Sequence, residues 1–160
     1  MGQGRHARGA QEPHPAYFPL IAGRLLAVLA FLWLFALSAF AEDKVVYHID
    51  NAEAQATKAL RNVRNHLDVA PDTKIIVVTH AEGIDFLMEG AKDRKNPNID
   101  YASLVSALKA RGVRFEVCEI TLRNRNLRKD QFIMDADFTP SGVARIGQLQ
   151  TREGYAYIKP

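Results

Sequence analysis

Cys118 is the single cysteine of this 160-residue chain, and it ends the segment RFEVC at 114–118. A cysteine whose thiolate is stabilised acts as a nucleophile, and it can accept sulfur as a persulfide or be oxidised. A free cysteine is also a common small apolar side chain in protein cores. Which interpretation applies depends on where the thiol lies in the fold and on the side chains beside it.

Four polar or reactive residues follow four expected strands of the chain: Asp50, His80, Cys118 and Ser141. Because ligands bind outside the carboxyl ends of the strands in open parallel sheets, we expect these residues to share one edge of the sheet. Three of them also have purely structural interpretations. Asp50 and Ser141 are also placed to cap helices, and His80 to satisfy a loop carbonyl group. Their convergence favours a functional thiol.

The residues after Cys118 add local chemistry. If the stretch EITLRNRN at 119–126 forms a helical turn, Cys118 lies at its N-terminus, where unpaired amides and the helix dipole favour a thiolate. Thr121 and Asn124 are then candidate hydrogen-bond donors to the sulfur, and Arg123 and Arg125 would add positive potential. The alternative for this basic run is a solvated surface.

Motifs for other chemistries are absent from the sequence. It contains no C-x-x-C, H-E-x-x-H or G-x-S-x-G motif and no glycine-rich phosphate loop. His48, His66 and His80 do not have the spacing of a metal-binding cluster. We therefore expect neither a metal nor a cofactor.

The first 41 residues predict a signal peptide. An arginine-bearing lead runs into LLAVLAFLWLFAL, and the segment ends at SAFA with Ala39 and Ala41 in the arrangement that signal peptidase accepts. The apolar run is shorter than the roughly 20 residues of a membrane-spanning helix. We expect cleavage after Ala41 and a periplasmic or secreted protein with no membrane attachment. An uncleaved signal anchor and a misassigned start site are the alternatives.

Cleavage would leave 160 − 41 = 119 residues, enough for one domain over 42–160. Lys plus Arg would fall from 21 to 18 and Asp plus Glu from 18 to 17, so the net charge would be about +1. Such a balance gives no electrostatic reason to expect nucleic acid as a partner. In an oxidising compartment, an unpaired cysteine indicates an intermolecular bridge or a free reactive thiol.

Strand and helix patterns alternate along residues 42–160. Short apolar or β-branched runs predict strands at 44–49, 74–80, 113–118, around 135–139 and at 155–159. Apolar spacings of three and four predict helices over 52–67, 84–91, 104–111 and 141–150. Strands joined by helices require crossover connections. We therefore expect an α/β fold, a three-layer sandwich with a mainly parallel sheet of about five strands flanked by helices.

Local patterns give three further expectations. Asp50 and Glu53 are placed as a capping pair for the first helix. Val143, Ile146 and Leu149 should lie on one face of the last helix. The third strand alternates apolar and polar residues, so we expect it near an edge of the sheet or against a subunit partner.

Residues 44–159 resemble the DsrE/DsrF-like proteins, the family named for sulfur-relay components. The resemblance rests on KVVYHID, IIVVTHAEGIDFLMEG, GVRFEVCEITLRNRNL and PSGVARIGQLQTREGYAYIKP. The last two segments are most similar to the secreted, single-domain branch. The resemblance implies an α/β sandwich, assembly into trimers or hexamers, and in several members a cysteine that carries sulfane sulfur between partners. Cys118 is the matching cysteine.

These observations support a leading hypothesis and two alternatives. The first is a periplasmic homo-oligomer in which Cys118 carries sulfur as a persulfide between an unidentified donor and acceptor, with Arg123 and Arg125 holding the thiolate and His80 assisting proton movement. The second is a non-catalytic oligomer that binds a small anion or thiol at the strand ends. In the third, Cys118 only packs. The sequence leaves open whether the carrier turns over as a sulfurtransferase.

Overall fold

The computed structural model describes residues 42–160. The predicted signal peptide, including its cleavage point after Ala41, lies outside the described residues. Five strands form one sheet: β1 Lys44–Asn51, β2 Lys74–Glu82, β3 Arg114–Cys118, β4 Ala136–Thr139 and β5 Ala156–Ile158. Four α-helices and two 3-10 turns connect them: α2 Ala52–Val69, η1 Asp85–Leu87, α3 Tyr101–Lys109, α4 Glu119–Asn124, η2 Lys129–Gln131 and α5 Gly142–Arg152.

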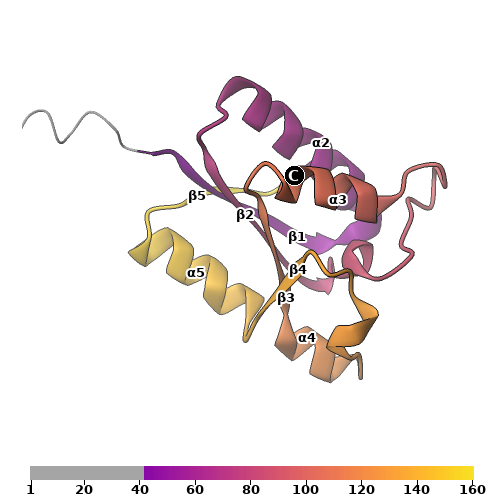
Figure 1. The fold of residues 1–160 in the computed structure, drawn as a ribbon. Helices are drawn as coiled ribbons and strands as arrows, with labels where there is room; N and C mark the ends of the chain where they lie inside the picture. The colour runs from indigo at the N-terminus through magenta and orange to yellow at the C-terminus, as the bar shows by residue number, and fades with distance from the viewer. Residues whose placement is uncertain (1–41) are drawn as a thin grey trace, which may run out of the picture. The chain divides into compact units, whose positions relative to one another are not determined.

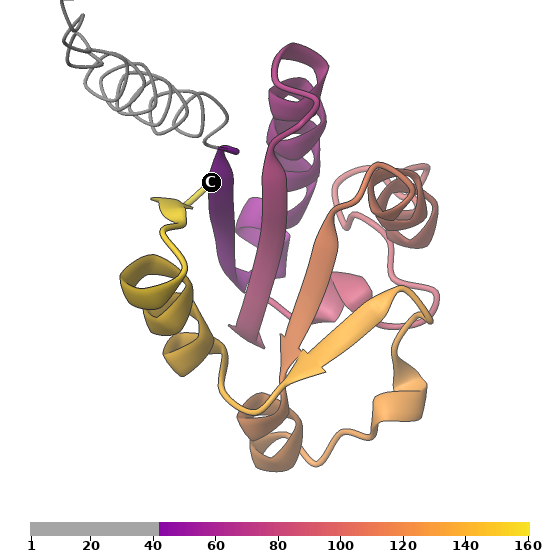
Figure 2. The same ribbon diagram turned by 60° about the vertical axis from the view of Figure 1, so that its left-hand side comes forward.

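The sheet has the order β4-β3-β2-β1-β5, and all four neighbouring pairs are parallel. Helices α2 and α3 cover one face of the sheet, and α5 crosses back over the other (Figure 1 and Figure 2). The predicted three-layer α/β sandwich is therefore confirmed. No helix within residues 42–160 is long and apolar enough to cross a bilayer.

The two faces of the sheet bury very different amounts of apolar surface. The α2 and α3 face holds the main core, which includes Tyr47, Ile49 and Phe115. The α5 face holds a much smaller cluster of five buried residues: Val46, Ile76, Val78, Ile146 and Leu149. Because burial of apolar area provides most of the stabilisation of packed elements, α5 has few apolar anchors on the sheet.

The start of α2 differs from the predicted capping pair. Asn51, and not Asp50, is the N-cap, and its side chain accepts a hydrogen bond from the backbone N–H of Ala54. The amide oxygen of Gln55 accepts from the backbone N–H groups of Asp50 and Asn51, the role expected for Glu53. The Asp50 carboxylate instead forms an ion pair with Lys159. Asp and Asn are both strong caps, and the boundary falls one residue later because β1 continues to Asn51.

The predicted helix at 84–91 is also wrong, because only a single 3-10 turn forms there, from Asp85 to Leu87. Met88 then turns to an extended conformation and makes an antiparallel bridge with Phe132. The tertiary pairing thus replaces the helical hydrogen bonds that the apolar spacing of this segment would otherwise have favoured.

The last helix agrees with the prediction at its start and departs from it at one position. Ser141 is the N-cap of α5, and its hydroxyl accepts from the backbone N–H of Ala144. Ile146 and Leu149 are buried against the sheet, as expected. Val143, however, is 66% exposed. It lies on the outer side of the helix because Gly142 occupies the position closest to the sheet.

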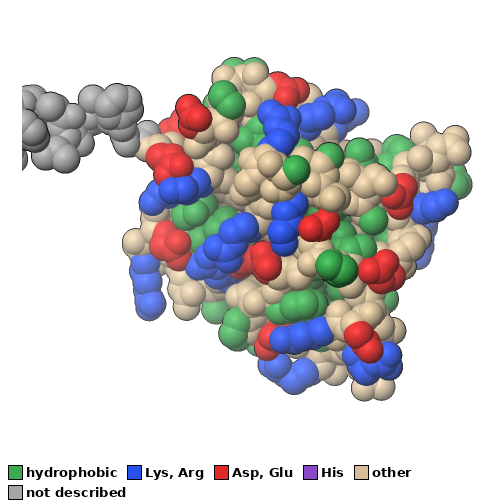
Figure 3. Space-filling view, in the orientation of Figure 1, with side chains coloured by type: hydrophobic (Ala, Val, Ile, Leu, Met, Phe, Trp, Pro, Cys, Tyr) green, Lys and Arg blue, Asp and Glu red, His purple; other side chains and the backbone are tan. Residues whose placement is uncertain are grey.

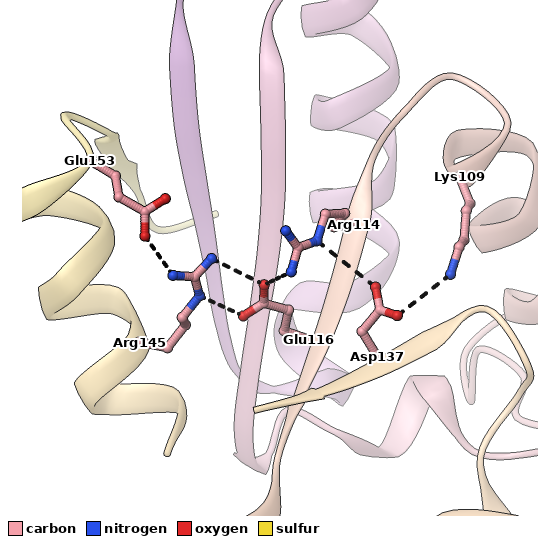
Figure 4. Close-up of polar contacts among 6 residues, drawn as sticks. All are labelled: Lys109, Arg114, Glu116, Asp137, Arg145 and Glu153. Carbon is pink, nitrogen blue, oxygen red and sulfur yellow. Dashed lines mark hydrogen bonds and ion pairs between the residues drawn. The ribbon is translucent and has the colours of Figure 1, made fainter. Parts of the chain in front are cut away.

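The third strand, β3, lies next to the edge strand β4, as its alternating pattern predicted. Its polar face is nevertheless covered, because Glu116 is only 2% exposed beneath α5. Glu116 belongs to a series of ion pairs that crosses this face from α3 to the end of α5 (Figure 4). On the surface drawn in Figure 3, basic and acidic side chains are interspersed and do not gather by sign.

Candidate active site

The carboxyl ends of β1 to β4 lie along the same edge of the parallel sheet, which brings the four predicted strand-end positions to one side of the molecule. His80 and Cys118 directly follow Thr79 and Val117, which are paired on neighbouring strands. The Cβ atoms of His80 and Cys118 each lie 3.3 Å from the position that a Cβ on Gly142 would occupy. His80, Cys118 and the first residue of α5 therefore meet at one point.

The other two strand-end residues lie at the same edge but are occupied locally. Asp50 is held by Lys159, and Ser141 caps α5. Ser141 thus fixes the start of α5, and Asp50 fixes the C-terminal segment that carries Lys159.

The sulfur of Cys118 lies at the N-termini of two helices. Cys118 is itself the N-cap of α4, with extended backbone angles and no capping hydrogen bond from its side chain. The backbone N–H groups of Ile120 and Thr121 and the Thr121 hydroxyl nevertheless lie near enough to lower the pKa of the thiol. The backbone N–H of Gly142, the first residue of α5, acts in the same direction. Such unpaired amides at helix starts favour a negative charge.

These donors outweigh the effect of burial on the thiol. Burial alone raises the pKa of the Cys118 thiol, because it disfavours the thiolate. The hydrogen bonds from Gly142, Thr121 and Ile120 act in the opposite direction, so that the pKa of Cys118 falls below its ordinary value. The residue is 4% exposed. The site therefore combines a lowered thiol pKa with a nearly buried cysteine.

A glycine is needed at position 142 because α5 approaches the strand ends closely. A Cβ there would lie 3.2 Å from the carbonyl oxygen of Thr79 and 3.3 Å from the Cβ atoms of Cys118 and His80. A larger residue would push the first turn of α5 away from the sheet and weaken its hydrogen bond to the sulfur. Gly142 was not singled out in the sequence, because a glycine after a serine cap has no distinctive local pattern.

A chain of three side chains extends from β5 to the site. The hydroxyl of Tyr157 lies 2.7 Å from Nδ1 of His48, and Nε2 of His48 lies 2.7 Å from Nε2 of His80. Either direction of donation along the chain satisfies these contacts, depending on the histidine tautomers. This hydrogen-bonded chain connects Tyr157 on β5 and His48 on β1 to His80 on β2.

His48 is neutral near pH 7. Burial, the charge of Lys159 and the neighbouring His80 lower the pKa of His48 to about 4, against a smaller opposing effect of Asp50. Sequence reasoning missed this residue because it lies inside a strand. Its signal was the alternation of β1, which places His48 on the same face as Val46, the face that α5 covers.

The basic residues after Cys118 lie further out. Arg125 donates to the carboxylate of Asp85 at 2.6 Å and to the carbonyl oxygen of Ala81 at 3.2 Å. Arg123 and Asn124 are exposed on α4. The hydrogen-bond donors described above are backbone amides and Thr121, and they do not include Asn124. The predicted roles of Arg123 and Arg125 in holding the thiolate remain predictions.

A cavity of about 420 Å³ opens near the same edge, beside the ion pair of Arg125 and Asp85. Its walls also include the basic side chains of Lys92 and Arg94 and the ring of Tyr101. Cys118 is not among its lining residues. Within residues 42–160, no group of three His, Cys, Asp or Glu side chains is arranged to hold a metal ion.

Comparisons with known proteins give one protein family and two solved structures that the chain is similar to. The model of the DsrE/DsrF-like family matches residues 34–160. A solved structure of a protein of unknown function, MTH1491 from Methanobacterium thermoautotrophicum, is 34% identical, with a TM-score of 0.66 over 74% of this chain and 100% of that one. The ychN protein from E. coli is 12% identical, with a TM-score of 0.61 over 74% of this chain and 99% of that one, and shows the fold alone. No curated protein matches the chain.

Proposed function

We propose that this chain, which belongs to the DsrE/DsrF-like family, is a sulfur carrier that holds sulfane sulfur as a persulfide on Cys118. The family resemblance of the sequence is confirmed, and membership fits a role in sulfur relay in general. The observation that carries the proposal is the position of Cys118, which is the N-cap of α4 and lies against Gly142, the first residue of α5. Gly142, Thr121 and Ile120 lower the pKa of its thiol.

The proposed loading step transfers one sulfur atom without net oxidation or reduction. The Cys118 thiolate attacks the outer sulfur of a donor R–S–SH, the S–S bond of the donor breaks, and R–S⁻ leaves with the bonding electron pair. Cys118 then carries Cys–S–SH. In the unloading step an acceptor thiolate attacks the outer sulfur, and Cys118 leaves as a thiolate. Both the attack and the departure are favoured by a lowered thiol pKa.

His80 is the side chain best placed to move the proton of the thiol. His80 directly follows Thr79, which is paired with Val117, the residue before Cys118. Nε2 of His80 is hydrogen-bonded to Nε2 of His48. A proton taken from the thiol can be balanced by a shift along the chain toward Tyr157. We propose that His80 serves loading in this way, with Arg123 and Arg125 adding positive potential near the exit of the site.

The small exposed fraction of Cys118 supports an expectation about the donor. Cys118 is only 4% exposed, so little of the residue is open to a reactant in solution. Linear inorganic polysulfide should therefore react faster than a bulky disulfide, because access is one of the factors that set rates of thiol exchange.

We further propose that the carrier works as a homo-oligomer, a trimer or hexamer, in the periplasm or outside the cell. The location is supported by the signal-peptide pattern before Glu42. The assembly is supported by the family resemblance and by the apolar or aromatic side chains exposed on the α5 side, among them Val143 and Tyr157.

Intact-mass analysis after polysulfide treatment tests the carrier function. We expect the protein comprising residues 42–160 to gain the mass of one or more sulfur atoms, and a reductant to remove it. Cys118→Ser should gain none. Alkylation of the native thiol as a function of pH should give a midpoint below the ordinary value of about 8.5. A native thiol that gains no sulfur and alkylates only after unfolding would overturn the proposal.

A second candidate function is favoured by the cavity beside Arg125. Its volume of about 420 Å³ suits a small anion held without covalent chemistry. Lys92 supplies a positive charge there, whereas Arg94 and Arg125 are paired with the acidic lining residues Glu53 and Asp85. In that case, binding of a small anion such as thiosulfate or sulfite, measured by calorimetry, should survive Cys118→Ser and be lost in Arg94→Gln combined with Lys92→Gln. Binding that disappears with the cysteine would exclude this candidate.

A further inference from the structure

Strand β3 and helix α5 are joined by two contacts that lie side by side. Glu116 and Cys118 are two residues apart on β3 and point to the same face. Gly142 and Arg145 are three residues apart on α5, about one turn, and also share a face. Nε of Arg145 donates to Oε2 of Glu116 at 3.0 Å, and Gly142 lies so close to Cys118 that a Cβ on it would be 3.3 Å from the Cys118 Cβ. The backbone N–H of Gly142 also lowers the pKa of the thiol.

The contact between Arg145 and Glu116 has the geometry to fix an element in place. A second guanidinium nitrogen of Arg145, Nη2, lies 3.4 Å from Oε1 of Glu116, so the arginine fork faces the carboxylate with two nitrogens. The Glu116 side chain is 3% exposed and that of Arg145 is 18% exposed. Separating two charges that are this deeply buried is strongly unfavourable, so the pair resists any sliding of α5 along the sheet.

Apolar packing alone would not give α5 the same precision. The buried cluster on this face is limited to five residues, of which Ile146 and Leu149 belong to α5. Apolar contacts carry no directional preference, and small shifts along the sheet change the buried area little. A directional contact would hold the first turn of the helix beside Cys118 more precisely than this apolar packing.

We propose that Arg145 and Glu116 are positioning residues for Cys118: their buried ion pair fixes α5 against β3 and thereby keeps the Gly142 amide close to the thiol. The inference deepens the proposed function, because it assigns control of the carrier thiol to a pair of residues that do not touch it. It rests on that function for its biological meaning and on the two contacts for its physical basis.

The site offers matched variants that separate position from charge. Arg145→Lys keeps the positive charge and loses the fork, whereas Arg145→Met loses both. Arg114→Gln removes another partner of the same carboxylate, 2.7 Å away, but Arg114 lies on β3 itself and forms its ion pairs with residues of β3 and β4. Glu153→Gln removes the other partner of Arg145, at the C-cap of α5. The two glutamine variants are the controls.

The measurement is the pH profile of Cys118 alkylation in the folded protein, made together with a urea unfolding curve for each variant. The other titratable or charged groups around this end of the sheet stay unchanged throughout: His80 on β2, Glu119 on α4 and Arg125 at the C-cap of α4. We expect Arg145→Lys and Arg145→Met to shift the alkylation midpoint upward by about half to one pH unit. That shift is about a three- to tenfold smaller thiolate fraction below the midpoint, as expected for loss of one hydrogen bond to the charged form.

Arg114→Gln and Glu153→Gln should leave the midpoint within error of the unmodified protein. A double variant, Glu116→Leu with Arg145→Leu, should recover stability through apolar packing and still show the raised midpoint. The inference is overturned if the Arg145 variants alkylate like the unmodified protein, or if Arg114→Gln shifts the midpoint equally. Alkylation needs no sulfur donor, so a failure of sulfur uptake in the unmodified protein would count against the proposed function and leave this test intact.

Discussion

The hydroxyl of Thr121 accepts a hydrogen bond from the backbone N–H of Ala81 at 3.0 Å, and the same hydroxyl lowers the pKa of the Cys118 thiol. Ala81 has a φ of +50°, a conformation that is uncommon for residues other than glycine. Its carbonyl oxygen accepts from Arg125. The strained end of β2 is thus held by hydrogen bonds on both sides, and one of them leads directly to the thiol.

Two substitutions of Thr121 test the effect of its hydroxyl separately from the effect of its shape. Thr121→Val should raise the alkylation midpoint of Cys118, because one donor to the thiolate is lost, and should lower the free energy of unfolding by about 1 kcal/mol, because the Ala81 N–H loses its acceptor. Thr121→Ser keeps the hydroxyl and should retain the midpoint. Equal midpoints for the valine and serine variants would show that the hydroxyl does not act on the sulfur.

Adding one methyl group at position 142 tests the close approach of α5. Gly142→Ala places a Cβ against Thr79, His80 and Cys118, so we expect a higher alkylation midpoint, slower sulfur uptake and a loss of about 1–2 kcal/mol in unfolding free energy. Gly147→Ala, on the same helix but with open space around its Cβ, is the control. It should keep the midpoint and stabilise the protein by up to about 1 kcal/mol. Identical thiol behaviour in both variants would contradict the role assigned to Gly142.

Stability should depend on pH through His48. Its pKa is about 4 in the folded protein against 6.5 in the unfolded chain, so the unfolded state binds more protons between these values. The contribution of His48 to the free energy of unfolding is then fully present above about pH 6.5 and is lost as the pH falls toward 4. We expect a loss of about 1–2 kcal/mol, discounted from the full linkage because the ring is only partly buried.

The His48 titration can be followed directly by NMR of the ring protons, with urea unfolding at several pH values alongside. His48→Gln should flatten the stability profile between pH 6.5 and 4. A ring that titrates near its ordinary value, or a profile that the substitution leaves unchanged, would argue against a buried neutral His48.

Processing of the N-terminal segment is a separate prediction. When the full chain is expressed in a bacterium, we expect the exported protein to begin at Glu42, because the SAFA segment ends in small residues that signal peptidase accepts. N-terminal sequencing of the periplasmic fraction measures this. Ala39→Lys should block cleavage and retain the protein at the membrane. Full-length unmodified protein in the membrane fraction would instead identify a signal anchor.

Two of the donors to Cys118 illustrate what the sequence could and could not indicate. Thr121 is the third residue of the helix that Cys118 caps, so helical geometry alone brings its amide and hydroxyl to the sulfur. Gly142 reaches the same atom only because β4 lies beside β3 and α5 then crosses back over the sheet. Topology of this kind is not contained in any local pattern.

The burial of Glu116 likewise could not be predicted from the local sequence pattern. The alternation of β3 correctly indicated a polar face, but a carboxylate on such a face is ordinarily expected in solvent. Glu116 is buried because Arg145 reaches it from an element that comes much later in the chain. The element order, the parallel sheet and the Ser141 cap followed from periodicity and capping signals, whereas the boundary at Asn51 depended on how far β1 pairs with β2.

Because α5 crosses back over the sheet, the site is completed only late in the synthesis of the chain. A chain emerging from a ribosome or a translocation channel presents Cys118 and Thr121 well before Gly142 and Arg145, and β5 joins β1 last of all. Until then, the sulfur lacks one of its two helix ends, and Glu116 lacks the arginine that balances it. The nascent polypeptide therefore carries an ordinary cysteine, and the reactive thiol is a property that the domain acquires on completion.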